Sequence, residues 1–301
     1  MSHGSLDDDA VESYREAGAL LVETMNEARE MVEPGRTHLA VAEWAEDHIR
    51  EQGAGLAFPV NISVDPEASH ATPSREDDTT FGEEMVCLDI GVHVDGYIAD
   101  AAVTIDHTGN TELVEAAEMA LEAAVDEAGP GVEVGVVGQA IEDVIRGYGY
   151  TPVLNLSGHG VERHDAHTEP TIPNRGVDRS TTLEPGQVVA IEPFATDGRG
   201  KVGEGTVEEI FEQQGSASVR DRRARQLLDA IEAFDDLPFA ARWLDDERAT
   251  VGLRRLKQAN AIKGYPVLKE ADDALVSQAE HTLMITDDGV EVTTAGIHAF
   301  D

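Results

Sequence analysis

Residues 85–105, MVCLDIGVHVDGYIADAAVTI, contain the pattern from which the fold can be deduced. Two apolar stretches flank Asp95-Gly96, a pair favoured in two-residue turns, and they predict two buried antiparallel strands. If Asp95-Gly96 forms the turn, Gly91 lies opposite Asp100. Because side chains alternate along a strand, Asp89 and Asp100 then project from the same face of the hairpin as diagonal neighbours.

Two carboxylates that converge on a buried face are energetically unfavourable by themselves. They repel each other unless cations lie between them. The alternative is a solvated hairpin face without function, but the apolar residues around Asp89 and Asp100 indicate that both strands are buried. We therefore predict a cation site on this face of the hairpin.

Further potential ligands stand in or beside other apolar stretches. His159, in Ser157-Gly158-His159, is expected just after a strand, in a Gly-flanked turn, and His167 follows eight residues later. Glu192 ends one apolar stretch, and Glu280 lies inside another. An unpaired buried Glu is costly, and these strands contain no Lys or Arg. Four carboxylates and one imidazole suit two divalent cations that accept oxygen and nitrogen ligands.

Around this hairpin the sequence predicts an α+β fold, in which helices interleave with antiparallel strands. Apolar residues at helical spacing predict helices over residues 11–31, 37–52, 113–125 and 136–145. We expect a loop at 69–78, and strands over residues 56–64, 153–156, 188–194, 274–285 and 290–293.

Composition excludes several classes of protein. The 301 residues carry a formal net charge of −38, and 41% of them are apolar, which is enough for a core. One Cys excludes a disulfide framework and a zinc site built from several thiolates. The acidic N-terminus does not resemble a secretion signal or a mitochondrial presequence, and no apolar run approaches the roughly 18 residues that span a bilayer. Because the negative charge also argues against binding nucleic acid or anionic membranes, we expect a cytoplasmic protein.

The charge is unevenly distributed along the chain. Residues 197–270 hold 13 Lys/Arg and 14 Asp/Glu, whereas the other 227 residues hold 9 and 46. This near-neutral segment, with helical stretches expected at 221–234, 239–244 and 251–260, predicts a small helical subdomain inserted into a main body of residues 1–196 and 271–301. Only 4 of the 22 basic residues are Lys. Acid excess with scarce Lys predicts a halophilic source and a stability that rises toward molar KCl.

Taken together, these residues resemble the methionine aminopeptidases. The motifs that carry the resemblance span nearly the whole chain: Phe58-Pro59-Val60-Asn61, His70 with Thr72-Pro73, Asp89 and Asp100, Ser157-Gly158-His159, His167, Ile191-Glu192-Pro193-Phe194 and Glu280-His281-Thr282. The 87 residues between Glu192 and Glu280 resemble the type II, archaeal form, which has a winged-helix-like insertion there. The resemblance implies the pita-bread fold, an α+β fold whose two pseudo-twofold halves surround a dinuclear metal centre.

The resemblance also implies ligand roles. Asp89 would bind one divalent ion, His159 and Glu192 the other, and Asp100 and Glu280 would bridge both. Co, Mn, Fe and Zn all accept this ligand set. The two ions would share a hydroxide that attacks the first peptide bond of the substrate.

Other residues would contact the substrate. By the resemblance, His167 would stabilise the oxyanion, His70 would contact the scissile amide, and Glu192 would also shuttle a proton to the leaving amine. Phe58 and Tyr265 would line the pocket for the methionine side chain. Ala166 stands where relatives carry a larger aliphatic residue, so we expect its smaller side chain either to widen that pocket or to leave a gap that a neighbour fills.

The implied substrates are N-termini of nascent polypeptides that begin with Met. This implies transient proximity to the ribosome, no membrane association, no stable binding of nucleic acid, and a monomer. One alternative is a prolidase or aminopeptidase P, but these carry a large extra N-terminal domain, and only 88 residues precede Asp89. The other is a non-catalytic pita-bread binding protein, a kind that typically loses the metal ligands that are complete in this sequence.

Overall fold

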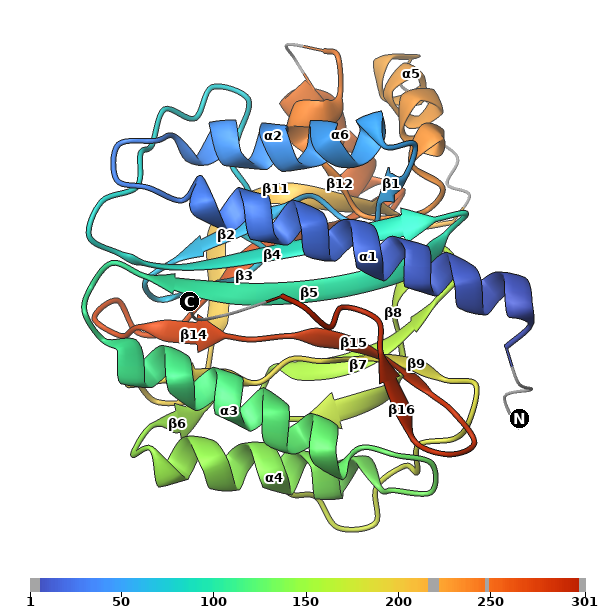
Figure 1. The fold of residues 1–301 in the computed structure, drawn as a ribbon. Coiled ribbons are helices and arrows are strands. Elements are labelled where there is room, and N and C mark those ends of the chain that lie inside the picture. The colour runs from blue at the N-terminus through green and yellow to red at the C-terminus, as the bar shows by residue number, and fades with distance from the viewer. Residues whose placement is uncertain (1–5, 216–221, 247–248, 298–301) are drawn as a thin grey trace.

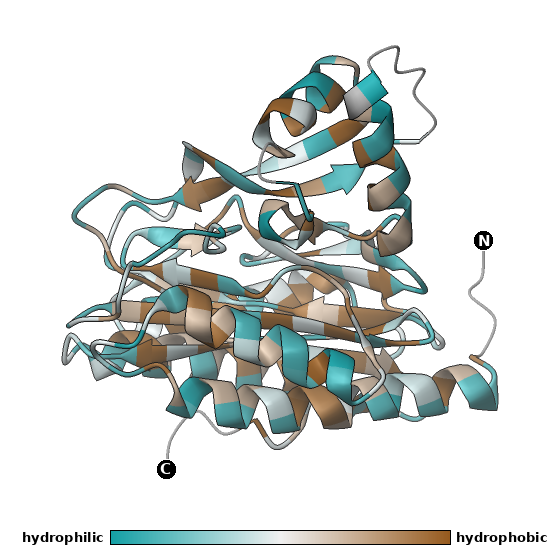
Figure 2. Ribbon diagram, turned by 90° about the horizontal axis from the view of Figure 1, so that it is seen from above, coloured by the Kyte–Doolittle hydropathy of each residue, from teal (hydrophilic) through white to brown (hydrophobic). Residues whose placement is uncertain are grey.

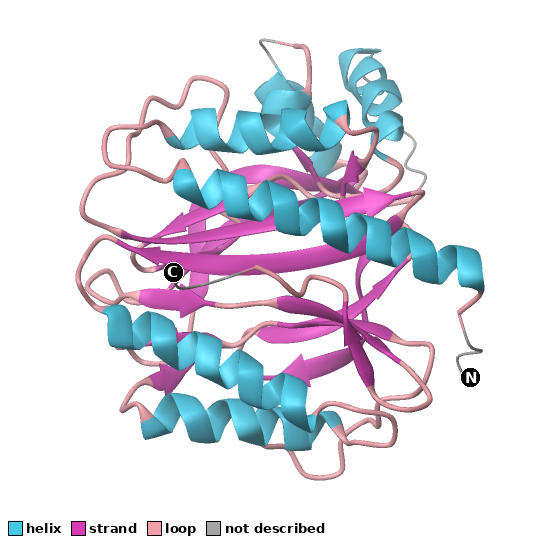
Figure 3. Cartoon of the chain, in the orientation of Figure 1, coloured by secondary structure: helices cyan, strands magenta, loops and turns pink. Residues whose placement is uncertain are grey.

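The computed structural model describes residues 6–215, 222–246 and 249–297. Strands occupy the middle of the molecule, and helices α1–α4 lie along one side of them (Figures 1 and 3). Seen from above, the remaining two helices and their strands project from the opposite side (Figure 2). In the part of the chain described, no helix is both long enough and apolar enough to cross a bilayer.

The first half of the body places two helices over an antiparallel sheet in the order β1-β4-β2, with β5 paired to β4. Its elements are α1 (Asp8–Glu30), α2 (His38–Glu51), β1 (Gly55–Leu56), β2 (Asn61–Val64), β4 (Met85–Val94) and β5 (Tyr97–Asp106). α1 begins at Asp7, whose side chain accepts a hydrogen bond from the backbone N of Ala10. The buried side chains of α1 recur every three or four residues and include Leu21 and Met25, which pack in one cluster with β4.

The second half repeats this layering. α3 and α4 cover two antiparallel sheets, in the orders β14-β10-β6 and β16-β15-β9-β7-β8. The elements are α3 (Thr111–Glu127), α4 (Val134–Gly147), β6 (Thr151–Pro152), β7 (Ser157–Glu162), β8 (Asp165–Pro173), β9 (Val188–Ile191), β10 (Phe194–Thr196), β14 (Val276–Gln278), β15 (His281–Ile285) and β16 (Val290–Val292). The four helices and the strand at 290–293 lie within a few residues of their predicted bounds.

The β4–β5 hairpin has the predicted register. Gly91 pairs with Asp100, and Asp89 pairs with Ala102. Asp95 and Gly96 both have positive φ, at 51° and 88°, which is the conformation of a type I′ two-residue turn. Most of β4 and β5 is buried, because the hairpin is covered on one side by α1 and contacts β14 and β15 on its edge.

Residues 197–270, hereafter the insertion segment, contain more strand than the sequence predicted. Its two longest strands, β11 and β13, are antiparallel and were missed by the helical interpretation, and β13 also pairs with β3 of the body. A separate apolar cluster forms where the helices of this segment pack on β11 and β12. The elements are β11 (Gly203–Gln213), α5 (Arg222–Ile231), η1 (Glu232–Phe234), β12 (Phe239–Ala240), η2 (Ala241–Trp243), α6 (Ala249–Gln258) and β13 (Ile262–Lys269), with β3 at Glu67–Ser69.

Two predicted strands, and the predicted turn around His159, differ from the structure. The strand predicted at 56–64 is split into β1 and β2, and the residues between them bulge so that Phe58 lies against Gly91, where a Cβ atom would come within 2.4 Å of the ring. The strand predicted at 153–156 is absent from the described structure, and His159 lies inside β7 rather than in a turn. Its neighbour Gly158 serves close packing, because a Cβ atom there would lie 2.3 Å from the carbonyl oxygen of Ala190.

Interruptions also divide the strands predicted at 188–194 and 274–285. The first breaks at Glu192-Pro193 between β9 and β10, and the second at Ala279-Glu280 between β14 and β15. β9 pairs with β15 and β10 pairs with β14, so the two breaks lie opposite each other. Both segments of the chain therefore pass from one sheet to the next at the same level. As a result, the side chains of Glu192 and Glu280 point into the same space.

Candidate metal centre

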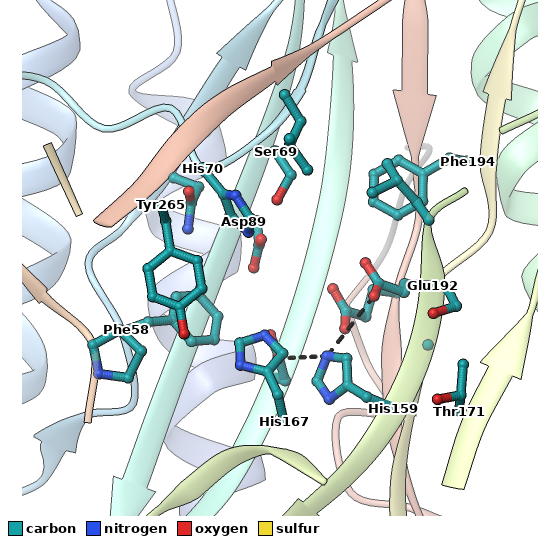
Figure 4. Close-up of a pocket in the computed structure, with 18 of the residues that line it drawn as sticks. Phe58, Ser69, His70, Asp89, His159, His167, Thr171, Glu192, Phe194 and Tyr265 are labelled. Carbon is teal, nitrogen blue, oxygen red and sulfur yellow. Dashed lines mark ion pairs between the residues drawn. The ribbon is translucent and has the colours of Figure 1, made fainter. Parts of the chain in front are cut away.

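A cavity of about 400 Å³ lies between the two halves of the body and the insertion segment. All of the predicted site residues except Ala166 line it (Figure 4): Phe58, His70, Asp89, Asp100, His159, His167, Glu192, Tyr265 and Glu280. No Lys or Arg occurs among the described residues that line this cavity. Acidic groups and imidazoles thus share a space from which basic side chains are absent.

The carboxylates come from a hairpin of adjacent strands and from two adjacent breaks between strands. Asp89 and Asp100 share one face of the β4–β5 hairpin, as the register requires. Glu192 and Glu280 face each other across the breaks in β9–β10 and β14–β15, since Ile191 pairs with His281 on one side of the breaks. Each half of the molecule therefore contributes two acidic side chains to one side of the cavity. This side, hereafter the floor, carries Asp89, Asp100, Glu192 and Glu280.

Threonine side chains join β5 of the first half to β14 and β15 of the second. The hydroxyl of Thr282 accepts from the backbone N of Asp100 and donates to its carbonyl oxygen, at 2.8 Å each. In the reverse arrangement, the hydroxyl of Thr104 donates to the carbonyl oxygen of Gln278 at 2.7 Å and accepts from its backbone N at 2.9 Å. Between these bridges the backbone N of Glu280 donates directly to Ala102 at 3.0 Å. This hydroxyl seam fixes Asp100 and Glu280 on neighbouring strands.

The four buried carboxylates of the floor are unfavourable in their charged form unless a cation lies among them. Burial raises the pKa of Asp89 to about 7, and burial together with neighbouring carboxylates raises the pKa of Asp100, Glu192 and Glu280 well above the ordinary value. Oδ1 of Asp89 and Oδ1 of Asp100 are buried with no hydrogen-bond partner among the described residues. Buried acceptors without donors are costly, and a divalent cation satisfies several at once.

His159 is oriented as a metal ligand should be. Its Nδ1 lies 3.2 Å from the carbonyl oxygen of Gly160, and because a carbonyl only accepts, Nδ1 carries the proton. Nε2 then points its lone pair toward Asp100 and Glu192, at 3.9 and 3.8 Å from their carboxylate oxygens. The contact with Glu192 is drawn as a dashed line in Figure 4. Burial lowers the pKa of His159 to about 4, which keeps the ring neutral. Three acceptors that face one another at these distances leave room for a cation, and Asp100, His159 and Glu280 present ligand atoms within 4.8 Å of one another.

Gln278 is a floor residue that the sequence reasoning missed. Its side-chain NH₂ donates to one oxygen of Glu192 and one of Glu280, both at 3.2 Å. The amide thus orients both glutamates while leaving their other oxygens free. The sequence did contain an indication of this role. Gln278 stands two residues before Glu280, so both would fall on the same side of the strand predicted at 274–285.

The wall above the floor is aromatic and imidazole-rich. The His159 and His167 rings lie 4.5 Å apart between centroids, and burial lowers the pKa of His167 to about 3. His70 has positive φ, 62°, and its Nδ1 lies 3.2 Å from the carbonyl oxygen of Pro266. The Tyr265 ring meets His70 edge-on at 5.1 Å. Burial lowers the pKa of His70 to about 4, so its imidazole is also neutral.

Ala166 does not line the cavity, contrary to the expectation that it widens the methionine pocket. It precedes His167 on β8 but is not among the residues that line the cavity, whereas His167, Thr168 and Glu169 are. The Ala166 side chain, 3% exposed, packs instead in an apolar cluster with Phe58 and Ile98.

Two layered halves around a buried set of acidic side chains and one imidazole define a metallopeptidase with the pita-bread fold. The model of metallopeptidase family M24 matches residues 12–222. Methionine aminopeptidases of Archaeoglobus fulgidus and Methanocaldococcus jannaschii are 47% and 43% identical to this chain, over 96% and 95% of it and 100% and 99% of their own lengths. The chain therefore belongs to metallopeptidase family M24, among its methionine aminopeptidases.

Solved structures with lower identity share the fold. A thermophilic Arx1 superposes with a TM-score of 0.87 at 18% identity, covering 96% of this chain and 91% of its own. The methionine aminopeptidase of Thermotoga maritima superposes with a TM-score of 0.70 at 22% identity, covering 97% and 98%. For the prolidase of Pyrococcus furiosus the TM-score is 0.65 at 19% identity, and the match covers 97% of this chain but only 65% of the prolidase.

Proposed function

We propose that this protein is a metal-dependent aminopeptidase that removes the N-terminal Met from nascent polypeptides. The observation that carries the proposal is the convergence of five potential ligands on one cavity whose described lining contains no basic residue. The identity of 47% to a methionine aminopeptidase over 96% of the chain supports the same reaction. Nascent chains as substrates imply a cytoplasmic enzyme that works transiently near the ribosome.

Two divalent ions fit the ligand set. Asp89 would hold one of them, His159 and Glu192 the other, and Asp100 and Glu280 both. Mn, Fe, Co and Zn are all compatible with four carboxylates and one imidazole. When bound, the ions lower the pKa of a water molecule and polarise the carbonyl group of the scissile bond.

The side chains of the protein then bind and orient the substrate. The carboxylates of the floor favour the amino group of a chain end over an internal peptide bond. Nδ1 of His70 donates to Pro266, so its Nε2 is an acceptor placed for the N–H of the scissile amide. The neutral ring of His167 donates to the carbonyl oxygen as negative charge develops on it. Glu192, which lines the cavity beside His159, would also pass a proton to the leaving amine.

The methionine side chain would occupy the apolar part of the cavity. Phe58 and Tyr265 line that part, together with Ile210, Pro238 and Leu268. All of these except Phe58 belong to the insertion segment. We therefore propose that residues 197–270 form the inserted subdomain of the type II enzymes and that this subdomain completes the specificity pocket.

The test is release of Met from a Met-Ala-Ser peptide by protein that has been stripped of metal and then reloaded with Mn, Fe, Co or Zn. We expect metal-dependent cleavage of this peptide and no cleavage of an X-Pro dipeptide. Metal analysis of protein purified without added metal or chelator gives the number and identity of the ions. Cleavage of the X-Pro dipeptide alone would point to a prolidase, and metal binding without any cleavage to a binding protein; either result contradicts the proposal.

A further inference from the structure

A buried ion pair joins the insertion segment to the body at a distance from the metal ligands. It links Glu46 of α2 to Arg242 of η2, whose side chains are 2% and 3% exposed. The guanidinium donates to Oε1 of Glu46, and the indole N–H of Trp243 donates to Oε2 at 2.6 Å. Arg75 covers this junction from the body by donating to the carbonyl oxygen of Arg242 at 2.9 Å.

Both partners of the pair also hold the backbone of one segment of the body. Glu46 accepts from the backbone N of Val60 at 3.3 Å. The second terminal nitrogen of Arg242 donates to the Thr72 hydroxyl at 2.7 Å and to the carbonyl oxygen of Pro73 at 2.9 Å. The Thr72 hydroxyl in turn donates to the carbonyl oxygen of Val60 at 2.7 Å. The pair therefore holds both ends of residues 60–73, hereafter the clasped segment, by hydrogen bonds.

The clasped segment carries part of the cavity wall. Asn61, Ser69 and His70 all line the cavity, and Phe58 lies just before the segment. His70 has a left-handed backbone, which a side chain other than Gly adopts only when its surroundings hold it there. On the insertion side, Pro266 and Tyr265 of β13 contact the His70 ring. The substrate-facing wall is thus assembled across the boundary that the ion pair bridges.

We propose that Glu46 and Arg242 are positioning residues that set the register of the substrate-contacting wall, His70, Phe58 and Tyr265, without acting on the metal-binding floor. The proposal rests on the proposed function for the identity of the substrate. The planar guanidinium fork bonds a carboxylate on one side and a hydroxyl and a carbonyl on the other, which admits little sliding of the insertion segment along α2. Because a buried charge is costly to leave unpaired, any other register is disfavoured. The floor is held separately by the hydroxyl seam.

The main test is the double variant Glu46→Met/Arg242→Met. It removes both charges together, so no unpaired buried charge remains to unfold the protein. We expect the affinity for Mn, measured by calorimetry, to stay within about twofold of the parent value. We expect KM for Met-Ala-Ser to rise at least about tenfold, because the wall no longer orients the substrate. Hydrogen exchange should become faster in residues 57–73 and stay unchanged in β5, β14 and β15, which the hydroxyl seam holds.

Arg242→Lys is a second variant that keeps the charge and the fold. A Lys ammonium cannot bond Glu46, Thr72 and Pro73 in the fixed geometry of the fork, so the rise in KM and the faster exchange should recur in milder form. Lys269→Met is the matched control. It breaks an ion pair across the same boundary, Lys269 with Glu67 at 2.8 Å, but both partners are partly exposed, so less than a twofold change is expected.

Several outcomes would overturn the proposal. Unchanged KM and unchanged exchange in Arg242→Lys would show that the pair does not set the wall. A loss of Mn affinity that accompanies the rise in KM would show that the pair supports the whole body instead. Failure of the parent protein to cleave Met-Ala-Ser would refute the proposed function, but it would leave the exchange measurement valid as a separate test of the positioning role.

Discussion

The floor and the wall of the cavity are held in different ways, although they lie a few ångströms apart. The floor residues lie on strands of the two halves, and the hydroxyl seam joins Asp100 to Thr282 directly. The wall combines the 57–73 segment with β13 of the insertion segment, and the buried pair Glu46–Arg242 links them. Metal affinity and substrate selection should therefore respond to different substitutions, because different contacts maintain them.

The largest expected effect concerns the floor. Asp100→Asn replaces a carboxylate proposed to bridge both ions, and we expect kcat to fall by at least about 10³-fold, equivalent to about 4 kcal/mol. The metal-free variant should be no less stable than the parent, because one of four mutually repelling carboxylates is gone. Peptide hydrolysis, metal stoichiometry and thermal unfolding check this. Near-normal turnover would rule out the dinuclear assignment.

A second prediction uses pH to separate the metal-free floor from the loaded one. Asp89 has its pKa raised to about 7, and the pKa values of the other three carboxylates are raised well above their ordinary values, so the native state without metal binds more protons than the unfolded state. Stability then falls as pH rises. The buried His residues, whose pKa values are lowered, act in the opposite direction, but only below about pH 6.5, where unfolded His is protonated.

We therefore expect the free energy of unfolding of the metal-free protein to decrease from pH 6.5 to 8, by about 1.4 kcal/mol per pH unit for each proton involved. Saturating Mn should reverse the slope, because metal binds the deprotonated carboxylates. Denaturant titrations at constant molar KCl, with chelator or with Mn, measure both slopes. Equal slopes in the two conditions would contradict a carboxylate-lined metal site.

The hydroxyl seam provides an intermediate effect on the floor. Thr282→Val keeps the shape of the side chain but removes both hydrogen bonds to the backbone of Asp100, and we expect Mn affinity to drop about 10- to 100-fold. KM for the peptide at saturating Mn should change much less, which is the reverse of the Arg242 variants. Thr282→Ser is the control and should restore most of the affinity. A rise in KM equal to the loss of Mn affinity would show that the floor and the wall are not held independently.

The smallest effect is expected at Ala166, which stands behind the wall. Ala166→Ile adds volume to a packed cluster and should cost about 1–3 kcal/mol of stability. Selectivity among peptides that begin with Met, norleucine and Phe should stay within about twofold, since Ala166 does not line the cavity. Thermal unfolding and relative kcat/KM values measure the two quantities. A large change in selectivity would mean that the cluster transmits its packing to Phe58.

The sequence by itself determined the local features of the floor. Asp95-Gly96 specifies the turn, and the turn sets the register that puts Asp89 and Asp100 on one face. Apolar stretches without basic residues identified the strands that flank Glu192 and Glu280. These features depend on neighbours in the chain, through side-chain alternation and turn geometry, so a single sequence is enough to predict them.

Tertiary structure decided everything that depends on distant parts of the chain. The contacts between Thr282 and Asp100 span 182 residues, and that between Arg242 and Glu46 spans 196. No periodicity links such residues, and a hydroxyl or a guanidinium can bond many partners. The breaks at Glu192-Pro193 and Ala279-Glu280, the placement of Ala166 behind the cavity and the strands of the insertion segment were missed for the same reason. Each of them follows from which surfaces pack together, and that is settled only when the two halves and the insertion segment bury their apolar faces against one another.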